Sequence, residues 1–295
     1  MNEPVSVDTR RFDAGGLLLA VHTWGASDAD GDARPILLAH CTGFHGMVWR
    51  PVAERLVAAG FSVWSFDFRG HGDSDVPDTE YRWDHFGDDV LSVVDHVGLV
   101  LRPDLIGVGH SKGGAALVLA EAERTGTFER LWLYEPVIFP GDPPPGPTRG
   151  NQLAESARRR RADFDSPDEA FENFAAKPPF NTLASDALRA YVDHGLRQRE
   201  DGRFALKCPG EMEARMYEMG SAHDGFKRLP GLTCPVRYVS GSTSLSMPEA
   251  FTRPLSERTP KGSFERAEGL GHFGPMEDPD AIVASILRFA EPTAG

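Results

Sequence analysis

The chain has 295 residues, long enough for one large α/β domain or for a domain with an insertion. Its formal net charge of −13 argues against nucleic acid or an anionic membrane as a partner, because both attract clustered Lys and Arg. The basic run at residues 158–161 is followed by Asp163 and Asp165, which favours a solvated helix face over a phosphate site.

The cysteines and the N-terminal residues indicate in which cellular compartment the protein is expected. Cys41, Cys208 and Cys234 are few, odd in number and widely spaced, so they fit neither a disulfide framework nor a zinc site. Residues 1–13 lack the apolar segment of a signal peptide, and no run is apolar enough to span a bilayer. We therefore expect a cytoplasmic protein with no metal.

Strand-like and helix-like segments alternate in the first part of the chain. Residues 16–25, 35–41, 61–68, 103–109 and 130–136 are predicted strands, the second apolar as a buried strand should be. Helical spacing predicts helices after Trp49, after an N-cap at Asp84, and over residues 112–124. This alternation predicts an α/β fold with a mostly parallel central sheet flanked by helices.

The alternation stops at residues 139–152, a cluster of Pro and Gly that is typical of a connector. From there to residue 230 mainly helices are predicted, including one with a capping box at residues 166–169. Alternation resumes at residues 234–241 and ends in a helix that begins at Asp278. We expect a core made of residues 1–135 and 231–295, with a helical insertion at residues 136–230.

A serine lies where a predicted strand turns into a predicted helix, in the segment Gly109-His110-Ser111-Lys112-Gly113. A serine hydroxyl becomes a useful nucleophile only beside a general base and near donors for the oxyanion it creates. A tight strand-to-helix turn projects the hydroxyl above the sheet and offers the next backbone N–H, that of Lys112, to the oxyanion. Ser111 is therefore the candidate nucleophile.

A second oxyanion donor is expected in the loop after the strand at residues 35–41. The backbone N–H of Thr42, or alternatively of Gly43, is placed for this role. For His40 and His45 we expect structural hydrogen bonds, those of His45 to loop backbone.

The general base should follow the last strand. Of the ten histidines, only His272 does so in a glycine-flanked loop, just before the final helix. His71 is the rival, but its loop is rich in turn residues and is expected to brace the site. Its polar neighbours are interpreted as structural hydrogen-bonding groups: Asp67, Arg69, Asp73 and Asp75.

The order of these motifs resembles that of the α/β-hydrolase-fold enzymes, and the resemblance covers the whole predicted core. It implies an α/β-hydrolase fold in which the insertion is a helical cap over the site. Two residues depart from the family pattern: Cys41 replaces a usual glycine, and Lys112 replaces an apolar residue or Gln.

The acid is a third departure. Family members usually carry it after the strand that here occupies residues 234–241, but residues 242–246 contain no carboxylate and Glu249 follows too late. Glu135 ends the strand after the nucleophile's helix, so a parallel sheet brings it to the same edge as Ser111. Haloalkane dehalogenases of one type and zearalenone-type lactone hydrolases resemble this arrangement. Glu135 is the candidate acid, and the alternatives are an anchor at the cap entrance or Asp73 or Asp75 as the acid.

Ser at position 111 argues against alkyl-enzyme chemistry, which needs a carboxylate nucleophile, and favours an acyl-enzyme. The predicted function is hydrolysis of a carboxylic ester, thioester or lactone of a small apolar substrate, with no cofactor. Two alternatives are a ligand-binding or receptor-like protein with little turnover, and a cofactor-free perhydrolase that uses the same triad. The predicted cap offers apolar residues for a pocket: Phe171, Phe174, Phe180, Tyr191, Met212, Met216 and Tyr217.

Overall fold

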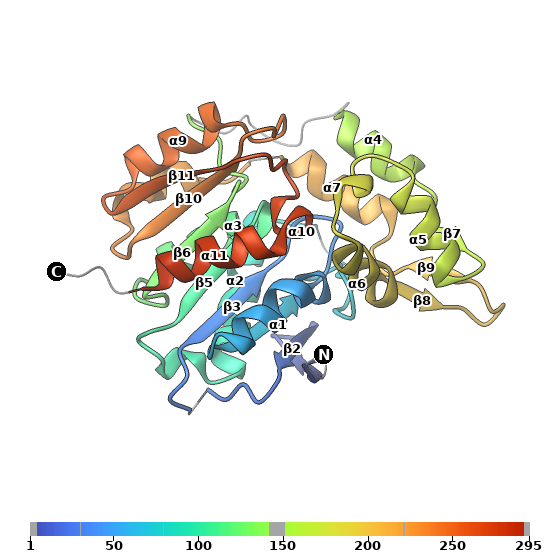
Figure 1. The fold of residues 1–295 in the computed structure, drawn as a ribbon, viewed down its shortest axis with the longest axis horizontal. Helices are drawn as coiled ribbons and strands as arrows, with labels where there is room; N and C mark the ends of the chain where they lie inside the picture. The colour runs from blue at the N-terminus through green and yellow to red at the C-terminus, as the bar shows by residue number, and fades with distance from the viewer. Residues whose placement is uncertain (1–4, 30, 79, 142–150, 221, 292–295) are drawn as a thin grey trace.

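The computed structural model describes residues 5–29, 31–78, 80–141, 151–220 and 222–291. Its centre is an eight-stranded sheet in the order β1-β2-β4-β3-β5-β6-β10-β11 (Figure 1). β2 pairs antiparallel with β1 and β4, and the other neighbouring strands pair in parallel, as predicted. The strands are β1 (Val7–Asp13), β2 (Leu18–Trp24), β3 (Pro35–Ala39), β4 (Ser62–Asp67), β5 (Ile106–His110), β6 (Arg130–Tyr134), β10 (Val236–Gly241) and β11 (Gly262–Ala267).

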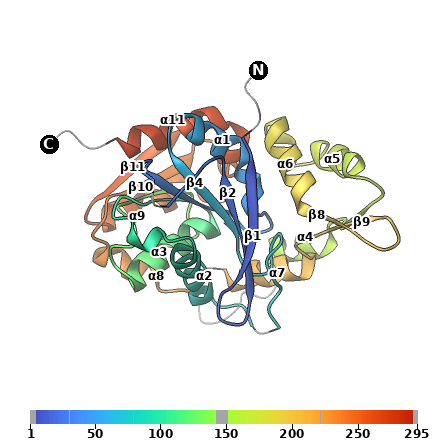
Figure 2. The same cartoon turned by 90° about the horizontal axis from the view of Figure 1, so that it is seen from below.

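Helices cover both faces of this sheet. α1 (Arg50–Ala58) and α11 (Pro279–Ala290) pack together on one face (Figure 2). The other face carries α2 (Trp83–His96), α3 (Lys112–Glu123) and α9 (Glu249–Arg258). Leu37 and Ala39 of β3 belong to the hydrophobic core cluster on one face of the sheet, and Ile36 and Leu38 belong to the cluster on the other face. Because successive side chains of a strand point to opposite faces, β3 is apolar throughout.

Between β6 and β10 the chain leaves the large sheet and forms a separate group of elements beside it (Figure 1). Its helices are α4 (Gln152–Arg159), α5 (Pro167–Ala175), α6 (Ser185–Gly195) and α7 (Gly210–Met219). The following α8 (Gly225–Arg228) packs against α3 on the face of the large sheet (Figure 2). The separate group also contains an antiparallel sheet of β7 (Asp163–Phe164), β9 (Phe204–Leu206) and β8 (Leu196–Gln198), which the sequence analysis missed. The division into a core and a cap at residues 136–230 stays a prediction.

The helix ends test the capping predictions. Ser166 accepts a hydrogen bond from Glu169 N–H (3.1 Å) as expected of the capping box, and Asp278 caps α11 through Ala281 N–H (2.9 Å). The N-cap prediction for Asp84 is wrong, because α2 begins at Trp83 and Asp84 lies in its first turn. There its charge still favours the positive end of the helix.

Further short elements connect the large ones. They are α10 (Gly274–Glu277) and the 3₁₀ helices η1 (Gly46–Trp49), η2 (Leu99–Leu101), η3 (Phe180–Thr182) and η4 (Leu229–Gly231). Most of the predicted Pro/Gly connector, residues 142–150, lies outside the described residues. Within the described ranges, no helix is long and apolar enough to cross a membrane.

α3 crosses the end of β3 so closely that only glycine fits at Gly113. A Cβ there would lie 2.2 Å from Ala39 O, whereas a Cβ at Gly231 would meet no atom within 4 Å. We expect Gly113→Ala to lower the free energy of unfolding by about 3 kcal/mol or more, since backbone must move. Gly231→Ala is the matched control, and urea unfolding measures both. Equal stability of the two variants would contradict the close approach.

Candidate active site

Ser111 lies at the turn between β5 and α3 in a strained backbone conformation. Its φ is +54°, and Glu135 is the other non-glycine residue with positive φ in the described part of the chain. Ser111 N–H donates to Tyr134 O (2.9 Å), which fixes the turn against the end of β6. Strained residues of this kind persist where surrounding structure holds them and are frequent at functional sites.

The carboxylate of Glu135 is fully buried and accepts three polar contacts. Gly241 N–H donates to Oε1 (2.9 Å), and the Ser244 hydroxyl donates to Oε2 (2.8 Å). His272 Nδ1 lies 2.6 Å from Oε2. The structure therefore brings Glu135 and His272 together. The loop after β10, where relatives of this fold usually carry an acid, here supplies donors to Glu135.

The loop of His272 is held by contacts that the sequence analysis missed. His110 Nε2 donates to His272 O (2.8 Å), and the Tyr134 hydroxyl donates to Gly271 O (2.7 Å). Gly271 N–H donates to Glu277 Oε2 (2.6 Å). His110 and Tyr134 directly precede Ser111 and Glu135, so their place at the strand ends was the signal that could have revealed them.

The contact with Glu135 sets the tautomer of His272. A carboxylate only accepts, so the Nδ1 atom carries the proton and the Nε2 lone pair is left for another donor. No hydrogen bond joins Nε2 to the Ser111 hydroxyl in this conformation. Such contacts are often long without substrate and shorten when it binds.

The candidate oxyanion donors differ in their present partners. Gly43 N–H donates to His71 Nε2 (3.2 Å) and is therefore occupied. Within the described residues Thr42 N–H has no acceptor, and Lys112 N–H lies at the first position of α3, where no intrahelical acceptor exists. The role of Thr42, or alternatively Gly43, as an oxyanion donor stays a prediction.

His71 is bound on both ring nitrogens and has no carboxylate partner. Its Nδ1 donates to Arg69 O (3.0 Å) while Nε2 accepts from Gly43. Burial and the nearby Lys112 charge hold the pKa of His71 well below its ordinary value. His71 is therefore a neutral ring that supports the loop of Thr42 and Gly43, the candidate oxyanion loop. It does not resemble a general base oriented by an acid.

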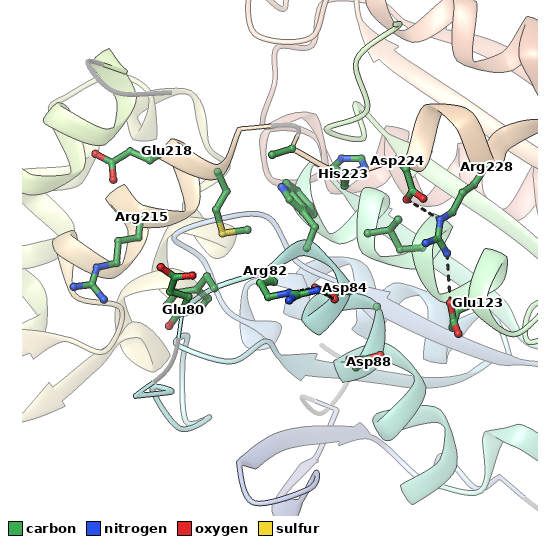
Figure 3. Close-up of a pocket in the computed structure, with 16 residues that line it drawn as sticks. Glu80, Arg82, Asp84, Asp88, Glu123, Arg215, Glu218, His223, Asp224 and Arg228 are labelled. Carbon is green, nitrogen blue, oxygen red and sulfur yellow. Dashed lines mark hydrogen bonds and ion pairs between the residues drawn. The ribbon is translucent and has the colours of Figure 1, made fainter. Parts of the chain in front are cut away.

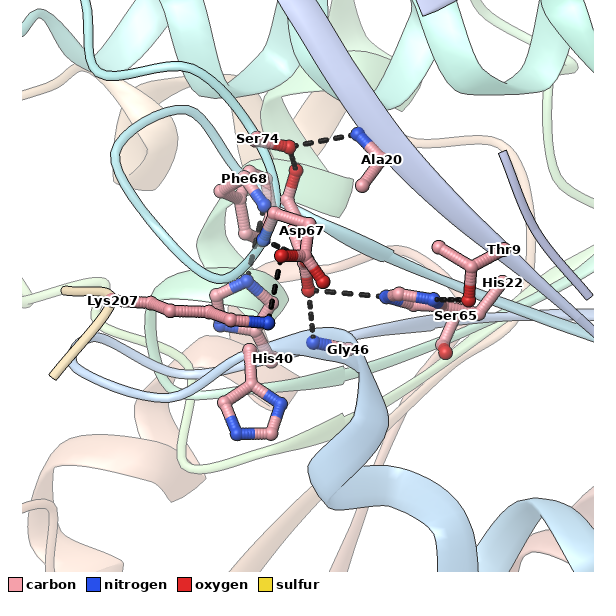
Figure 4. Close-up of polar contacts among 12 residues, drawn as sticks. Thr9, Ala20, His22, His40, Gly46, Ser65, Asp67, Phe68, Ser74 and Lys207 are labelled. Atoms are coloured by element: carbon pink, nitrogen blue, oxygen red, sulfur yellow. Dashed lines mark hydrogen bonds and ion pairs between the residues drawn. The ribbon is translucent and has the colours of Figure 1, made fainter. Parts of the chain in front are cut away.

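The neighbours of His71 brace the same loop through Asp67 (Figure 4). Asp67 Oδ1 accepts from Gly46 N–H (2.6 Å) and from His22 Nε2 (3.2 Å), and Oδ2 accepts from Asp73 N–H (2.7 Å). Burial alone would raise the pKa of Asp67, but the contacts and charge of His22 hold it below its ordinary value. This network joins β2, the end of β4 and η1.

Other predicted hydrogen-bonding residues have partners of the expected kind. Arg69 pairs with Asp89 of α2 (2.6 Å). His40 Nδ1 donates to Cys41 O (2.7 Å) and its Nε2 accepts from Phe68 N–H (3.1 Å). His45 Nε2 donates to Tyr191 O of α6 (3.0 Å), so it bonds backbone in the neighbouring segment instead of its own loop.

The side chain of Lys112 was not anticipated. It is 1% exposed, and its Nζ lies 3.3 Å from His71 Nε2 and 3.4 Å from His71 Nδ1. The rings of Phe68 and Phe86 have centroids 4.3 Å and 4.8 Å from Nζ. Burial lowers the pKa of this amine to about 7.

The cysteines are free thiols, each buried in a different part of the structure. Cys41 follows β3, Cys208 precedes α7 and Cys234 precedes β10. Burial raises the pKa of Cys208 and of Cys234 to about 12, and that of Cys41 even further. Within the described ranges, no three His, Cys, Asp or Glu side chains are grouped so that they could hold a metal ion.

One residue of the basic run at 158–161 is not solvated. Arg160 follows α4 and pairs with Glu213 of α7 (2.7 Å), and its side chain is 16% exposed. Glu213 lies against the oxyanion loop, because a Cβ at Gly43 would be 2.5 Å from Glu213 Oε1. The solvated-face interpretation is therefore wrong for Arg160.

Aromatic rings from both parts of the chain meet beside His272. Phe44 lies 4.9 Å from Tyr191, 5.7 Å from Phe180 and 5.3 Å from Phe273, measured between ring centroids. Phe273 directly follows His272. Of the predicted pocket residues, Phe180 and Tyr191 thus contact Phe44, which in turn contacts Phe273.

A groove lies away from these residues. It has a volume of about 790 Å³, and its wall is mainly charged (Figure 3). Neither Ser111, Glu135 nor His272 lines it. A small cavity of about 10 Å³ lies between the loop of Gly43 and the segment after β6, and Gly43, Phe44 and Arg160 help to line it.

The fold and these strand-end residues define an α/β-hydrolase. Residues 36–285 match the Alpha/beta hydrolase family, and the chain belongs to that family. It is 37% identical over 268 residues to a non-heme haloperoxidase of Rhodococcus erythropolis, covering 88% of this chain and 93% of that protein. It is 24% identical over 288 residues to the 2-(acetamidomethylene)succinate hydrolase of Mesorhizobium japonicum, covering 96% of this chain and 95% of that protein.

A solved structure supports the fold assignment. The peroxisomal alpha-beta-hydrolase Lpx1 of Saccharomyces cerevisiae has a TM-score of 0.79 and 20% identity to this chain. The match covers 100% of this chain and 92% of that chain. At this identity the likeness shows the fold alone.

The contact between Glu135 and His272 gives a direct test. Glu135→Gln preserves size but can stabilise the wrong imidazole tautomer, so kcat for hydrolysis should fall by up to about 10⁴. Asp75→Asn is the matched control, because Asp75 contacts Arg11 and Leu18 N–H. This substitution should lower kcat much less than Glu135→Gln does. Ser244→Asp in the Glu135→Gln background should recover part of the loss, since it places a carboxylate beside His272. Equal losses for Glu135→Gln and Asp75→Asn would refute Glu135 as the acid.

Proposed function

We propose that this chain is a serine hydrolase that cleaves a carboxylic ester, thioester or lactone of a small apolar substrate through an acyl-enzyme. The observation that carries the proposal is the 2.6 Å contact between His272 Nδ1 and Glu135 at the sheet edge that also presents Ser111. Nucleophile, base and acid in this relation form the arrangement that activates a serine hydroxyl. We assign the protein to the cytoplasm as part of the same proposal.

In the proposed acylation step, Ser111 Oγ bonds to the substrate carbonyl carbon and its proton passes to His272 Nε2. The negative charge on the carbonyl oxygen is stabilised by the N–H groups of Thr42 and Lys112. The bond to the leaving oxygen or sulfur then breaks, and that atom takes the proton from Nε2. Glu135 stabilises the imidazolium that forms between these events.

Deacylation repeats the sequence with water as the nucleophile. The water oxygen bonds to the acyl carbon while His272 takes a proton from that water. His272 then returns the proton to Ser111 Oγ as the ester bond of the acyl-enzyme breaks. The products are a carboxylic acid and the alcohol or thiol released earlier; from a lactone, one hydroxy acid contains both groups.

The surroundings of His272 support an apolar substrate. Phe44, Phe273, Phe180 and Tyr191 form an aromatic wall, and the last two come from the proposed cap at residues 136–230. Pockets of this kind bind apolar groups and use few polar contacts for orientation. We propose that the cap sets substrate choice and supplies no triad member.

The second candidate is cofactor-free perhydrolysis on the same triad, in which peroxide replaces water in the second step. The 37% identity to a protein named a non-heme haloperoxidase favours it. A binding protein with little turnover is the third candidate, and it is disfavoured by the complete set of Ser111, His272 and Glu135.

The first test uses a fluorophosphonate probe and a panel of esters, thioesters and lactones of graded size. We expect stoichiometric labelling at Ser111 and turnover of panel members, and loss of both in Ser111→Ala with the fold retained. Wild-type-like turnover by Ser111→Ala would overturn the acyl-enzyme mechanism. Ligand-induced stabilisation without turnover would favour the binding protein, and peroxide-dependent peracid formation that outruns hydrolysis would favour the perhydrolase.

A second test addresses the aromatic wall. Phe180→Ser should lower kcat/KM for long apolar acyl groups relative to acetyl esters by about tenfold or more, because it adds a hydroxyl and removes apolar contact. Phe171→Ser is the control, since Phe171 packs under Arg189 and does not contact Phe44. Equal changes for both chain lengths in Phe180→Ser would show that this wall does not contact the acyl group.

A further inference from the structure

A buried lysine without an acid partner lies directly behind the oxyanion loop. An ammonium group has three N–H donors and cannot accept a hydrogen bond. No carboxylate oxygen of the described residues lies within 4 Å of Lys112 Nζ to pair with it. The nearest acids already have partners: Asp67 accepts from His22 and backbone N–H groups, and Asp89 pairs with Arg69. Charged groups are seldom buried without a pair unless they serve a function.

The contacts of this amine lead to the oxyanion loop through one ring. The Nζ atom and Gly43 N–H both contact His71 Nε2, at 3.3 Å and 3.2 Å. Gly43 follows Thr42, one proposed oxyanion donor, and the backbone N–H of Lys112 itself is the other. Lys112 thus contributes in two ways: its backbone N–H is a proposed oxyanion donor, and its side chain contacts His71, which bonds Gly43 of the loop that holds the other donor.

We propose that the Lys112 side chain is a positioning residue that, through His71, holds the Thr42–Gly43 loop and places a positive charge behind the oxyanion. This inference rests on the proposed serine hydrolase function and adds a role for a side chain beyond the triad. Positive charge in a dry interior stabilises a developing oxyanion more than it would in water.

The role makes activity depend on pH in a specific direction. Burial lowers the pKa of Lys112 to about 7, so the charge is present below that pH and is lost above it. The titratable and charged groups that face it come from several elements: His71, His40, Cys41, Cys208, Asp67 and Asp89. The charge-dependent part of the rate should therefore decline as pH rises through about 7.

Stability should change with pH in the opposite sense. The pKa of Lys112 is lower in the folded chain than its ordinary 10.5, so the unfolded chain binds the extra proton between about 7 and 10.5. Stability contributed by this residue therefore rises with pH across that window. Lys112→Met removes the buried charge, so we expect its Tm at pH 6 to be higher than that of the wild type. Measuring this Tm also checks that the variant folds.

The experiment compares wild type, Lys112→Met, Lys112→Gln and the exposed control Lys177→Met from pH 5.5 to 9.5. Readouts are kcat/KM and the rate of fluorophosphonate labelling. Relative to wild type, Lys112→Met should lose about tenfold or more at pH 6 and much less at pH 9. Lys112→Gln keeps a polar side chain against the His71 ring without a titrating charge, so it should retain more activity than Met and lack the decline above pH 7. Lys177→Met should match wild type throughout.

Two outcomes separate this inference from the proposed function. If wild type is labelled and turns over but the ratio of wild type to Lys112→Met does not change with pH, the charge has no role and the inference is wrong while the hydrolase survives. If wild-type Ser111 is not labelled, the serine hydrolase proposal fails, and the positioning role fails with it.

Discussion

The buried carboxylate of Glu135 is the constraint on which the site depends. Removing an ionised carboxylate from water costs several kcal/mol unless its oxygens are satisfied. Its two oxygens are satisfied by groups from three segments: Gly241 at the end of β10, Ser244 in the next loop, and His272 after β11. A shift of Gly241 would leave Oε1 without its donor, and a shift of Ser244 or His272 would remove one of the two donors to Oε2. The carboxylate therefore fixes the relative positions of three strand ends.

The position of the candidate acid changes what its neighbours supply. Glu135 directly follows β6, and the loop after β10, residues 242–246, carries small hydroxyl residues and no carboxylate. The candidate acid and the candidate nucleophile follow adjacent parallel strands, and Ser111 N–H donates to Tyr134 O immediately before Glu135. The two strained residues of the site are thus one hydrogen bond apart, and each depends on the register of β5 with β6.

Much of this arrangement could be predicted from sequence because it depends on local patterns and strand order. Alternating strands and helices predicted the parallel sheet, and residues that end parallel strands must meet at one edge, which placed Glu135 near His272. The strands of the small sheet, β7 to β9, could not be predicted because two or three residues carry no periodicity. The contacts of Arg160 and of the Lys112 side chain depend on packing between segments far apart in the chain, which no local pattern encodes.

The three buried thiols can report on local opening of the structure around them. The thiolate is the form that attacks alkylating reagents, so a thiol whose pKa is raised to about 12 or further by burial stays inert while it remains buried. Modification must wait for a local opening, and its rate measures how often that opening occurs. Cys41 reports on the oxyanion loop, Cys208 on the approach to α7, and Cys234 on the start of β10. Comparing the three rates would show whether the segment between β6 and β10 opens independently of the large sheet.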